Sequence, residues 1–75
     1  MTAFERIREV ICEELGARPE DVTPETALGE LDADSLEIAA LVITLEDTLA
    51  VELSEEKWSR VSKVKDLVRL AQSGS

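Results

Sequence analysis

Apolar residues recur at steps of three and four positions in three separate parts of this 75-residue chain, and this period constrains the fold more than any other feature. Steps of this size place side chains on one face of an α-helix. The first such stripe consists of Phe4, Ile7, Ile11 and Leu15. Thr2 and Glu5 have the spacing of a capping box, and Gly16 is a common stop residue. We therefore predict a helix from Thr2 to Leu15.

A second helix is predicted from Ser35 to about Thr48 or Leu49. Asp34 is a favourable N-cap residue, and Glu37 follows it at the spacing of another capping box. The inward stripe consists of Ile38, Leu41, Val42, Leu45 and Leu49. A second apolar set, on another face beside Asp47, consists of Leu36, Ala39, Ala40 and Ile43. A small bundle buries only one face, so the second set indicates a face that binds a partner, although Ala40 alone is explained by its helix propensity.

The end of the chain predicts two further helices. After an extended link at residues 51–53, Ser54 caps a short third helix that runs to about Arg60. Trp58 in this helix is expected to pack on the core or at its edge.

Ser62 is expected to cap a last helix from Lys63 to about Gln72. Its buried face consists of Val64, Leu67, Val68 and Ala71. Residues 73–75 are expected to fray, as chain ends without packing commonly do.

Residues 16–33 are predicted to form a long loop, and connections of this length are usually functional or disordered. Its helix-breaking residues are Pro19, Pro24 and Gly29. The residues expected to pin it to the core are Val22, Leu28 and Leu31. A short helical turn is expected near residues 25–29. The predicted fold is therefore all-α, a four-helix bundle of three longer helices and a short third one, in a single domain of residues 1–75.

Charge is segregated along the chain, whose net charge is −9. The segment from Glu20 to Glu56 holds 12 acidic residues and no basic one, whereas residues 57–75 hold five basic residues and one acidic one. A long segment without positive charge repels phosphate backbones, which argues against a nucleic acid partner. A basic protein partner is the natural complement. Solubility alone would explain the net charge but not its segregation.

Residue types exclude several kinds of chemistry. The chain has no histidine and a single cysteine, Cys12, so it has no Ser-His-Asp triad, no disulfide and no histidine-containing metal site. It also lacks a glycine-rich phosphate loop. Cys12 is expected to be a small, partly buried apolar residue. Charges interrupt the N-terminus, and the longest apolar run, Ile38 to Ile43, is far too short to span a membrane.

The stretch from Leu31 to Glu37 is the most informative in the chain. If Asp34 caps the second helix, Ser35 occupies its first position with an exposed hydroxyl, near unpaired N–H groups and the positive end of the helix dipole. A phosphate ester on this serine would be stabilised there. Because no base is available to activate the hydroxyl, a second enzyme must modify it. An ordinary helix cap also explains the local sequence, and a calcium loop is excluded because Leu36 and Glu37 do not fit its ligand pattern.

The whole chain resembles the acyl carrier proteins of fatty acid and polyketide synthesis and their aminoacyl and peptidyl relatives. The matching stretches are Leu15-Gly16, Pro19-Glu20-Asp21-Val22-Thr23, Leu31-Asp32-Ala33-Asp34-Ser35-Leu36, Leu41-Val42, Leu45-Glu46-Asp47, Val51-Glu52-Leu53 and the closing amphipathic helix. The resemblance implies a four-helix bundle of acyl-carrier type and a non-catalytic carrier. It also implies that Ser35 carries a covalent 4′-phosphopantetheine arm, obtained from coenzyme A, whose thiol holds acyl cargo as a thioester.

In such proteins the second helix is the usual docking surface. By matching position, the candidate docking residues are Asp34, Leu36, Glu37, Ala39, Ile43, Glu46 and Asp47. The implied partners are a phosphopantetheinyl transferase and synthase, ligase or transferase enzymes with basic patches. The protein is expected to be a cytoplasmic monomer, and its initial Met and lack of long linkers favour a free-standing protein.

Several differences from the common family pattern bear on the role of the chain: the first loop is about one residue shorter, Leu49 replaces a frequent Phe, Ser54 replaces a frequent Pro, and Trp58 is bulkier than the usual residue. Asp32 occupies a position that is usually glycine, and Ala40 stands where many members have an acidic residue. These differences imply a specialised carrier with its own partners. An aminoacyl or peptidyl carrier is the nearest alternative. An alternative of another class is an unmodified acidic helical docking domain, for which Ser35→Ala would leave function intact.

Overall fold

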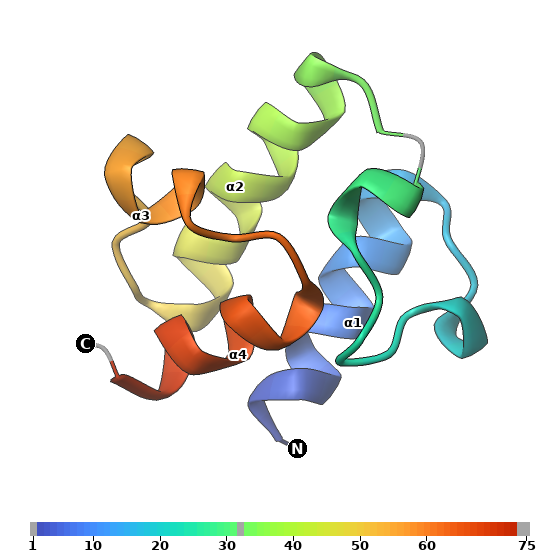
Figure 1. The fold of residues 1–75 in the computed structure, drawn as a ribbon, viewed down its shortest axis with the longest axis horizontal. Helices are drawn as coiled ribbons and strands as arrows, with labels where there is room; N and C mark the ends of the chain where they lie inside the picture. Colours follow the sequence, from blue (N-terminus) through green and yellow to red (C-terminus); the bar gives the residue numbers. More distant parts are fainter. Residues whose placement is uncertain (1, 32, 74–75) are drawn as a thin grey trace.

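The computed structural model describes residues 2–31 and 33–73 of the chain, and its elements are all helical (Figure 1). In chain order they are α1 (Ala3–Leu15), the 3₁₀ helices η1 (Pro19–Asp21) and η2 (Leu28–Leu31), α2 (Ser35–Leu49), α3 (Glu55–Ser59) and α4 (Val64–Ser73). Within the described part the β pairing is limited to one isolated bridge, between Ala27 and Lys63. The predicted all-α fold, with three longer helices and a short third one, is confirmed.

Helix α1 begins and ends at the residues that the sequence indicates. The Glu5 N–H donates to Thr2 Oγ1 at 3.1 Å, and the Thr2 N–H donates to Glu5 Oε1 at 3.0 Å, so Thr2 is the N-cap and the helix proper begins at Ala3. The bond from the Thr2 N–H, with a smaller contribution from the Thr2 side chain, holds the pKa of the Glu5 carboxyl below its ordinary value. At the other end Gly16 has a φ of 69° and its N–H donates to Cys12 O at 2.9 Å. Glycine adopts this left-handed conformation without the steric cost that a Cβ brings.

The core lies where α1, α2 and α4 meet, and the connections between them contribute to it. Its buried residues are Ile7, Val10, Ile11, Val22, Leu28, Leu41, Leu45, Leu53, Val64 and Leu67. Phe4 and Leu15 of the predicted stripe are only half-buried, and Val10 extends the buried face of α1 beyond that stripe. Cys12 is also half-buried against this core, and desolvation raises the pKa of its thiol. Trp58 packs there as well, as the sequence suggested.

The connection between α1 and α2 is held in place at several points. Val22 and Leu28 are buried and Leu31 is half-buried against the core, which confirms their predicted role. The backbone also bonds to the segment before α4, because the Leu28 N–H donates to Ser62 O at 2.9 Å and the Val64 N–H donates to Thr26 O at 3.0 Å.

The helical turns of this connection differ from the prediction. The turn expected near residues 25–29 occurs at Leu28–Leu31, and a second turn occurs at Pro19–Asp21. The fixed φ of Pro19 suits the first position of a helical turn, and the Val22 N–H closes it by donating to Pro19 O at 3.1 Å.

Helices α3 and α4 begin in different ways. Ser54 caps α3 as predicted, accepting from the Lys57 N–H at 3.3 Å. Before α4, however, the Ser62 hydroxyl is a donor, at 3.2 Å from Asp66 Oδ2. The same carboxylate oxygen accepts from the N–H groups of Ser62 and Lys63, both at 3.0 Å. Ser62 therefore does not cap α4 as predicted: the first-turn N–H groups of Val64 and Lys65 donate to Thr26 O and Pro24 O instead. The bonds from Ser62 and Lys63 lower the pKa of the Asp66 carboxyl.

Helix α4 extends to Ser73, one residue beyond the predicted end. Of the residues expected to fray, Gly74 and Ser75 lie outside the described part of the chain. Among the described helices, none combines the length and apolar character needed to cross a membrane.

Candidate attachment site and docking face

Ser35 is the first residue of α2, and its side chain is exposed. Asp34 precedes it in an extended conformation and accepts from the Glu37 N–H through Oδ1 at 2.8 Å. The Asp34 N–H donates in return to Glu37 Oε1 at 3.2 Å. The predicted capping box is therefore confirmed. It fixes the backbone on both sides of the serine while its hydroxyl faces solvent.

The surroundings of the Ser35 hydroxyl suit a phosphate ester. The N–H groups of Ser35 and Leu36 are in the first turn of the helix and have no intrahelical acceptor, because that turn has no preceding carbonyl groups. Together with the helix dipole they favour a negative group at this end. The carboxylates of Asp34 and Glu37 repel a negative group at this position. They lie at the solvent-accessible surface, however, where water screens the repulsion. The Ser35 hydroxyl has no histidine to activate it, since the chain has none.

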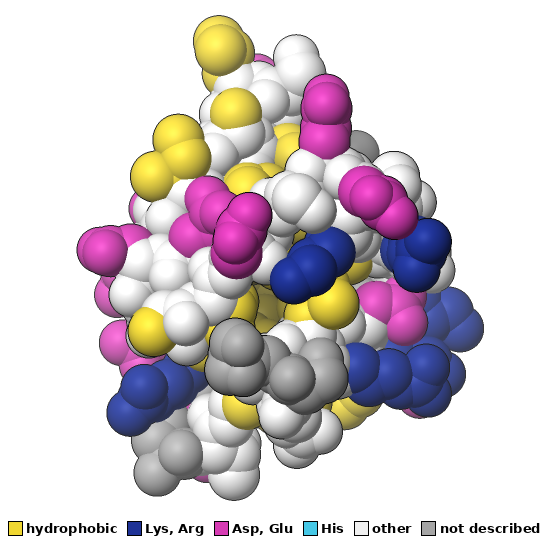
Figure 2. All heavy atoms as spheres, turned by 90° about the vertical axis from the view of Figure 1, so that its left-hand side faces the viewer, with side chains coloured by type: hydrophobic (Ala, Val, Ile, Leu, Met, Phe, Trp, Pro, Cys, Tyr) yellow, Lys and Arg dark blue, Asp and Glu magenta, His cyan; other side chains and the backbone are white. Residues whose placement is uncertain are grey.

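Helix α2 presents a second apolar face to solvent. We define the exposed ridge as Leu36, Ala39, Ala40 and Ile43. All four are exposed, and the relative exposure reaches 81% for Leu36 and 66% for Ile43. On the opposite side Leu41 and Leu45 are fully buried. Figure 2 shows hydrophobic side chains protruding from the upper part of the molecule, with acidic side chains beside them.

The predicted docking residues fall into two groups. Asp34, Leu36, Ala39, Ile43 and Asp47 are exposed along α2. Glu37 and Glu46, by contrast, are half-buried and act within the fold, Glu37 in the capping box described above.

Glu46 stabilises the connection that follows α2. Its Oε2 accepts from the Leu53 N–H at 2.9 Å, so this carboxylate holds the connection against the helix. The sequence reasoning assigned Glu46 to docking alone and missed this contact. The available signal was an acidic residue near the end of a helix that is followed by a short extended link.

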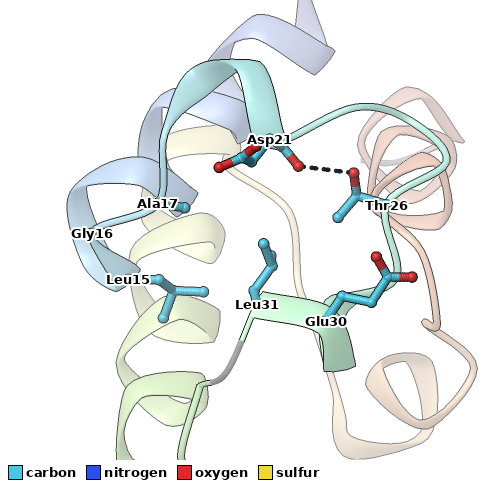
Figure 3. A pocket seen from close by; sticks show the side chains of 7 residues that line it. All are labelled: Leu15, Gly16, Ala17, Asp21, Thr26, Glu30 and Leu31. Atoms are coloured by element: carbon cyan, nitrogen blue, oxygen red, sulfur yellow. Dashed lines mark hydrogen bonds between the residues drawn. The ribbon is translucent and has the colours of Figure 1, made fainter.

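Sequence reasoning also missed a pocket in the connection between α1 and α2. It has a volume of about 390 Å³ and is lined by Leu15, Gly16, Ala17, Asp21, Thr26, Glu30 and Leu31. In Figure 3 the Leu31 side chain points into this pocket, the two carboxylates lie at its edges, and the Thr26 hydroxyl donates to Asp21 O at 3.0 Å. Its acidic lining is unsuited to an apolar chain, and none of the residues predicted for the site contributes to it.

The sequence of this chain matches a protein family and several known proteins. The family described as phosphopantetheine attachment site matches residues 5–71. The acyl carrier protein of Streptococcus pyogenes serotype M3 is 37% identical over 75 residues, covering 100% of this chain and 99% of that protein. The acyl carrier protein of Lactococcus lactis subsp. cremoris strain MG1363 is 38% identical over 73 residues, which are 97% of each chain.

A solved structure matches as well. The crystal structure of the acyl carrier protein from Thermotoga maritima has a TM-score of 0.75 and 31% sequence identity, covering 93% of this chain and 82% of that one. The chain belongs to the acyl carrier protein family. The resemblance inferred from its motifs is thus confirmed, and the protein is a non-catalytic carrier whose family bears a covalent 4′-phosphopantetheine group. Asp32, where the common pattern has glycine, lies outside the described residues.

Proposed function

We propose that this protein carries acyl groups as thioesters on a 4′-phosphopantetheine arm at Ser35 and presents them to enzymes of fatty acid or polyketide biosynthesis. The observation that supports this most directly is the position of Ser35, exposed at the first residue of a capped helix within the matched part of the chain. When bound, the group supplies a thiol at the end of a flexible arm.

Attachment requires a transferase, because this chain has no histidine to activate the Ser35 hydroxyl. The Ser35 oxygen attacks the phosphorus that bears the pantetheine moiety in coenzyme A. A new phosphoester bond forms, the pyrophosphate bond breaks, adenosine 3′,5′-bisphosphate leaves, and the hydroxyl proton passes to a base of the transferase. The capping box of Asp34 and Glu37 holds the serine backbone in one conformation, which reduces the ordering that the transferase must impose.

The exposed ridge is the proposed docking surface for the transferase and the synthases. Covering a large apolar side chain contributes roughly 1.5–3 kcal/mol, so Leu36 and Ile43 supply the apolar anchors. Asp34 and Asp47 lie at either end of the ridge on α2 and are exposed, so they can meet Lys or Arg side chains of a partner. An enzyme that combines a shallow apolar patch with basic residues fits this surface.

Intact mass measurement tests the attachment. The purified protein is incubated with coenzyme A and a broad-specificity phosphopantetheinyl transferase, and Ser35→Ala is compared with Ser59→Ala, which removes another exposed serine. We expect the wild type and Ser59→Ala to gain the mass of one phosphopantetheinyl group and Ser35→Ala to gain none. A mass gain in Ser35→Ala would show that the group is attached at another residue. No mass gain in any of the three proteins would favour an unmodified docking domain.

A further inference from the structure

A groove between α3 and α4 brings together several of the basic residues of the C-terminal segment. It has a volume of about 330 Å³ and is lined by Lys57, Arg60, Val61, Asp66, Arg69 and Leu70, which we call the basic groove. Three of these six residues are cationic and one is anionic. This local excess of positive charge contrasts with the net charge of −9 of the chain. Figure 2, which faces the side of the molecule on which α3 lies, shows Lys and Arg side chains in its middle and lower part.

Within residues 2–31 and 33–73, two of the three cations have only weak partners. Arg60 Nη2 is 3.4 Å from Glu56 Oε1, and both side chains are about four-fifths exposed, at 79% and 80%. Exposed pairs of this kind contribute about 0–1 kcal/mol and exchange readily with other partners. Lys57 Nζ donates to the Glu52 main-chain oxygen at 3.4 Å, and a neutral carbonyl leaves its positive charge uncompensated.

The third cation, Arg69, is also exposed and has a weak ion-pair partner. Its Nη1 is 4.0 Å from Asp66 Oδ1, at the limit of an ion pair, and its side chain is 72% exposed. The other carboxylate oxygen of Asp66 is already the acceptor for Ser62 and Lys63. The groove therefore retains net positive charge that can attract a negative partner.

The lining of the groove also has an apolar part. Val61 and Leu70 are half-buried and pack against the hydrophobic core. They line the groove together with the three cationic side chains, so the groove offers an apolar surface as well as positive charge to a segment that carries both an apolar side chain and negative groups. This combination differs from the exposed ridge of α2, which pairs apolar side chains with acidic ones.

We propose that the basic groove docks an acidic segment of a partner protein, in which Asp or Glu residues flank one apolar side chain. Charge complementarity supports this occupant. An anionic membrane is less suited, because lipid-binding clusters usually contain about 4–8 basic residues close together. A second copy of this chain is less suited as well, because two molecules of net charge −9 repel each other. The inference is independent of the modification at Ser35.

Peptide binding to the full-length protein tests this proposal. The probe is a fluorescein-labelled peptide of sequence DEDLED, and the uncharged peptide NQNLQN is its control. The groove variant Arg60→Gln/Arg69→Gln is matched with Arg6→Gln/Arg18→Gln, because both change the net charge equally and all four arginines are exposed. We expect DEDLED to shift amide resonances of residues 57–70, and its affinity to fall about tenfold in the groove variant and less than about twofold in the matched control.

Several results would overturn the proposal. An equal loss of DEDLED affinity in both double variants would show that binding depends on net charge and not on the groove. Equal affinities for DEDLED and NQNLQN would show that the peptide needs no negative charge. Absence of DEDLED binding would reject an acidic segment. In that case, Arg60- and Arg69-dependent sedimentation with phosphatidylcholine–phosphatidylglycerol vesicles would identify a lipid surface as the occupant. Self-association that the groove variant abolishes would identify a second copy.

Discussion

At the scale of single residues, each α-helix begins with a side-chain oxygen that accepts a backbone N–H. Thr2, Asp34 and Ser54 do so from the N-cap position, and Asp66 does so from inside α4. Such contacts matter in a chain of this length, because a small core leaves little excess stability. At Asp34 the same atoms also lie beside the proposed attachment serine, so one residue serves both the helix and the site.

Substitutions at Asp34 can separate these two roles. We expect Asp34→Ala to lower the free energy of unfolding by about 1 kcal/mol, because the Glu37 N–H loses its acceptor. Asp34→Asn keeps an acceptor oxygen and should cost only a few tenths of a kcal/mol, while it removes the negative charge offered to partners. Urea unfolding monitored by circular dichroism measures the stabilities, and the rate of phosphopantetheine transfer measures docking.

The two readouts should diverge. The asparagine variant should keep its stability but react more slowly with the transferase, and that loss should shrink at high salt. Equal destabilisation by alanine and asparagine would show that the carboxylate charge, and not the cap, stabilises α2.

At the scale of elements, α2 has two apolar faces, of which only one contributes to the core. Leu41 and Leu45 are fully buried against the core, whereas Leu36 and Ile43 are largely exposed. A helix in a small bundle needs only the first face for folding. The second face therefore adds nothing to the core, and the cost of exposing it to water is recovered only when a partner covers it.

This difference predicts that similar substitutions on the two faces have very different effects on stability. Leu36→Ala/Ile43→Ala should change the free energy of unfolding by no more than about 0.5 kcal/mol, as exposed substitutions usually do. Leu41→Ala should destabilise by about 2–5 kcal/mol, because it leaves a cavity. Unfolding curves measure these effects, and phosphopantetheine transfer should slow in the ridge variant despite its intact fold. Normal transfer in that variant would exclude the ridge as the docking surface.

The elements that could be predicted from sequence are those with signals at both ends and a periodic face between them. Helix α2 meets this condition, since Asp34 and Glu37 mark its start and its stripe extends to Leu49. The short η1 was missed and η2 was misplaced, because three or four residues are too few to show a helical periodicity of apolar side chains. The bond from Leu53 to Glu46 was missed for another reason: the chain has to turn back on α2 before the two groups meet.

The candidate site follows the same logic. The exposure of Ser35 and of the ridge could be predicted, because both depend on local helix geometry. The basic groove could not be predicted as a groove, because its lining comes from α3, from α4 and from the connection between them. The sequence showed only that basic residues accumulate after Glu56.

At the scale of the whole molecule, the acidic residues outnumber the basic ones by nine. The chain carries a net charge of −9 within a body whose Cα radius of gyration is 10.9 Å. At physiological salt the Debye length is about 8–10 Å, so repulsion acts mainly between acidic groups that lie close together, and at low salt it reaches across the whole molecule. The ion pairs that join separate elements, from Glu25 to Lys63 and Lys65, are at least partly exposed and contribute little.

Self-repulsion should therefore limit the stability of the fold, and salt should relieve it. Raising NaCl from about 20 mM to about 500 mM at pH 7 should raise the thermal midpoint by about 5 °C, equivalent to about 1 kcal/mol in a domain of this size. The variant Glu9→Gln/Glu30→Gln removes two exposed carboxylates and changes the net charge from −9 to −7. It should melt at a higher temperature than wild type at low salt and gain less from added salt. A midpoint that falls with salt would show that the ion pairs, and not the excess of acidic groups, dominate the electrostatics of folding.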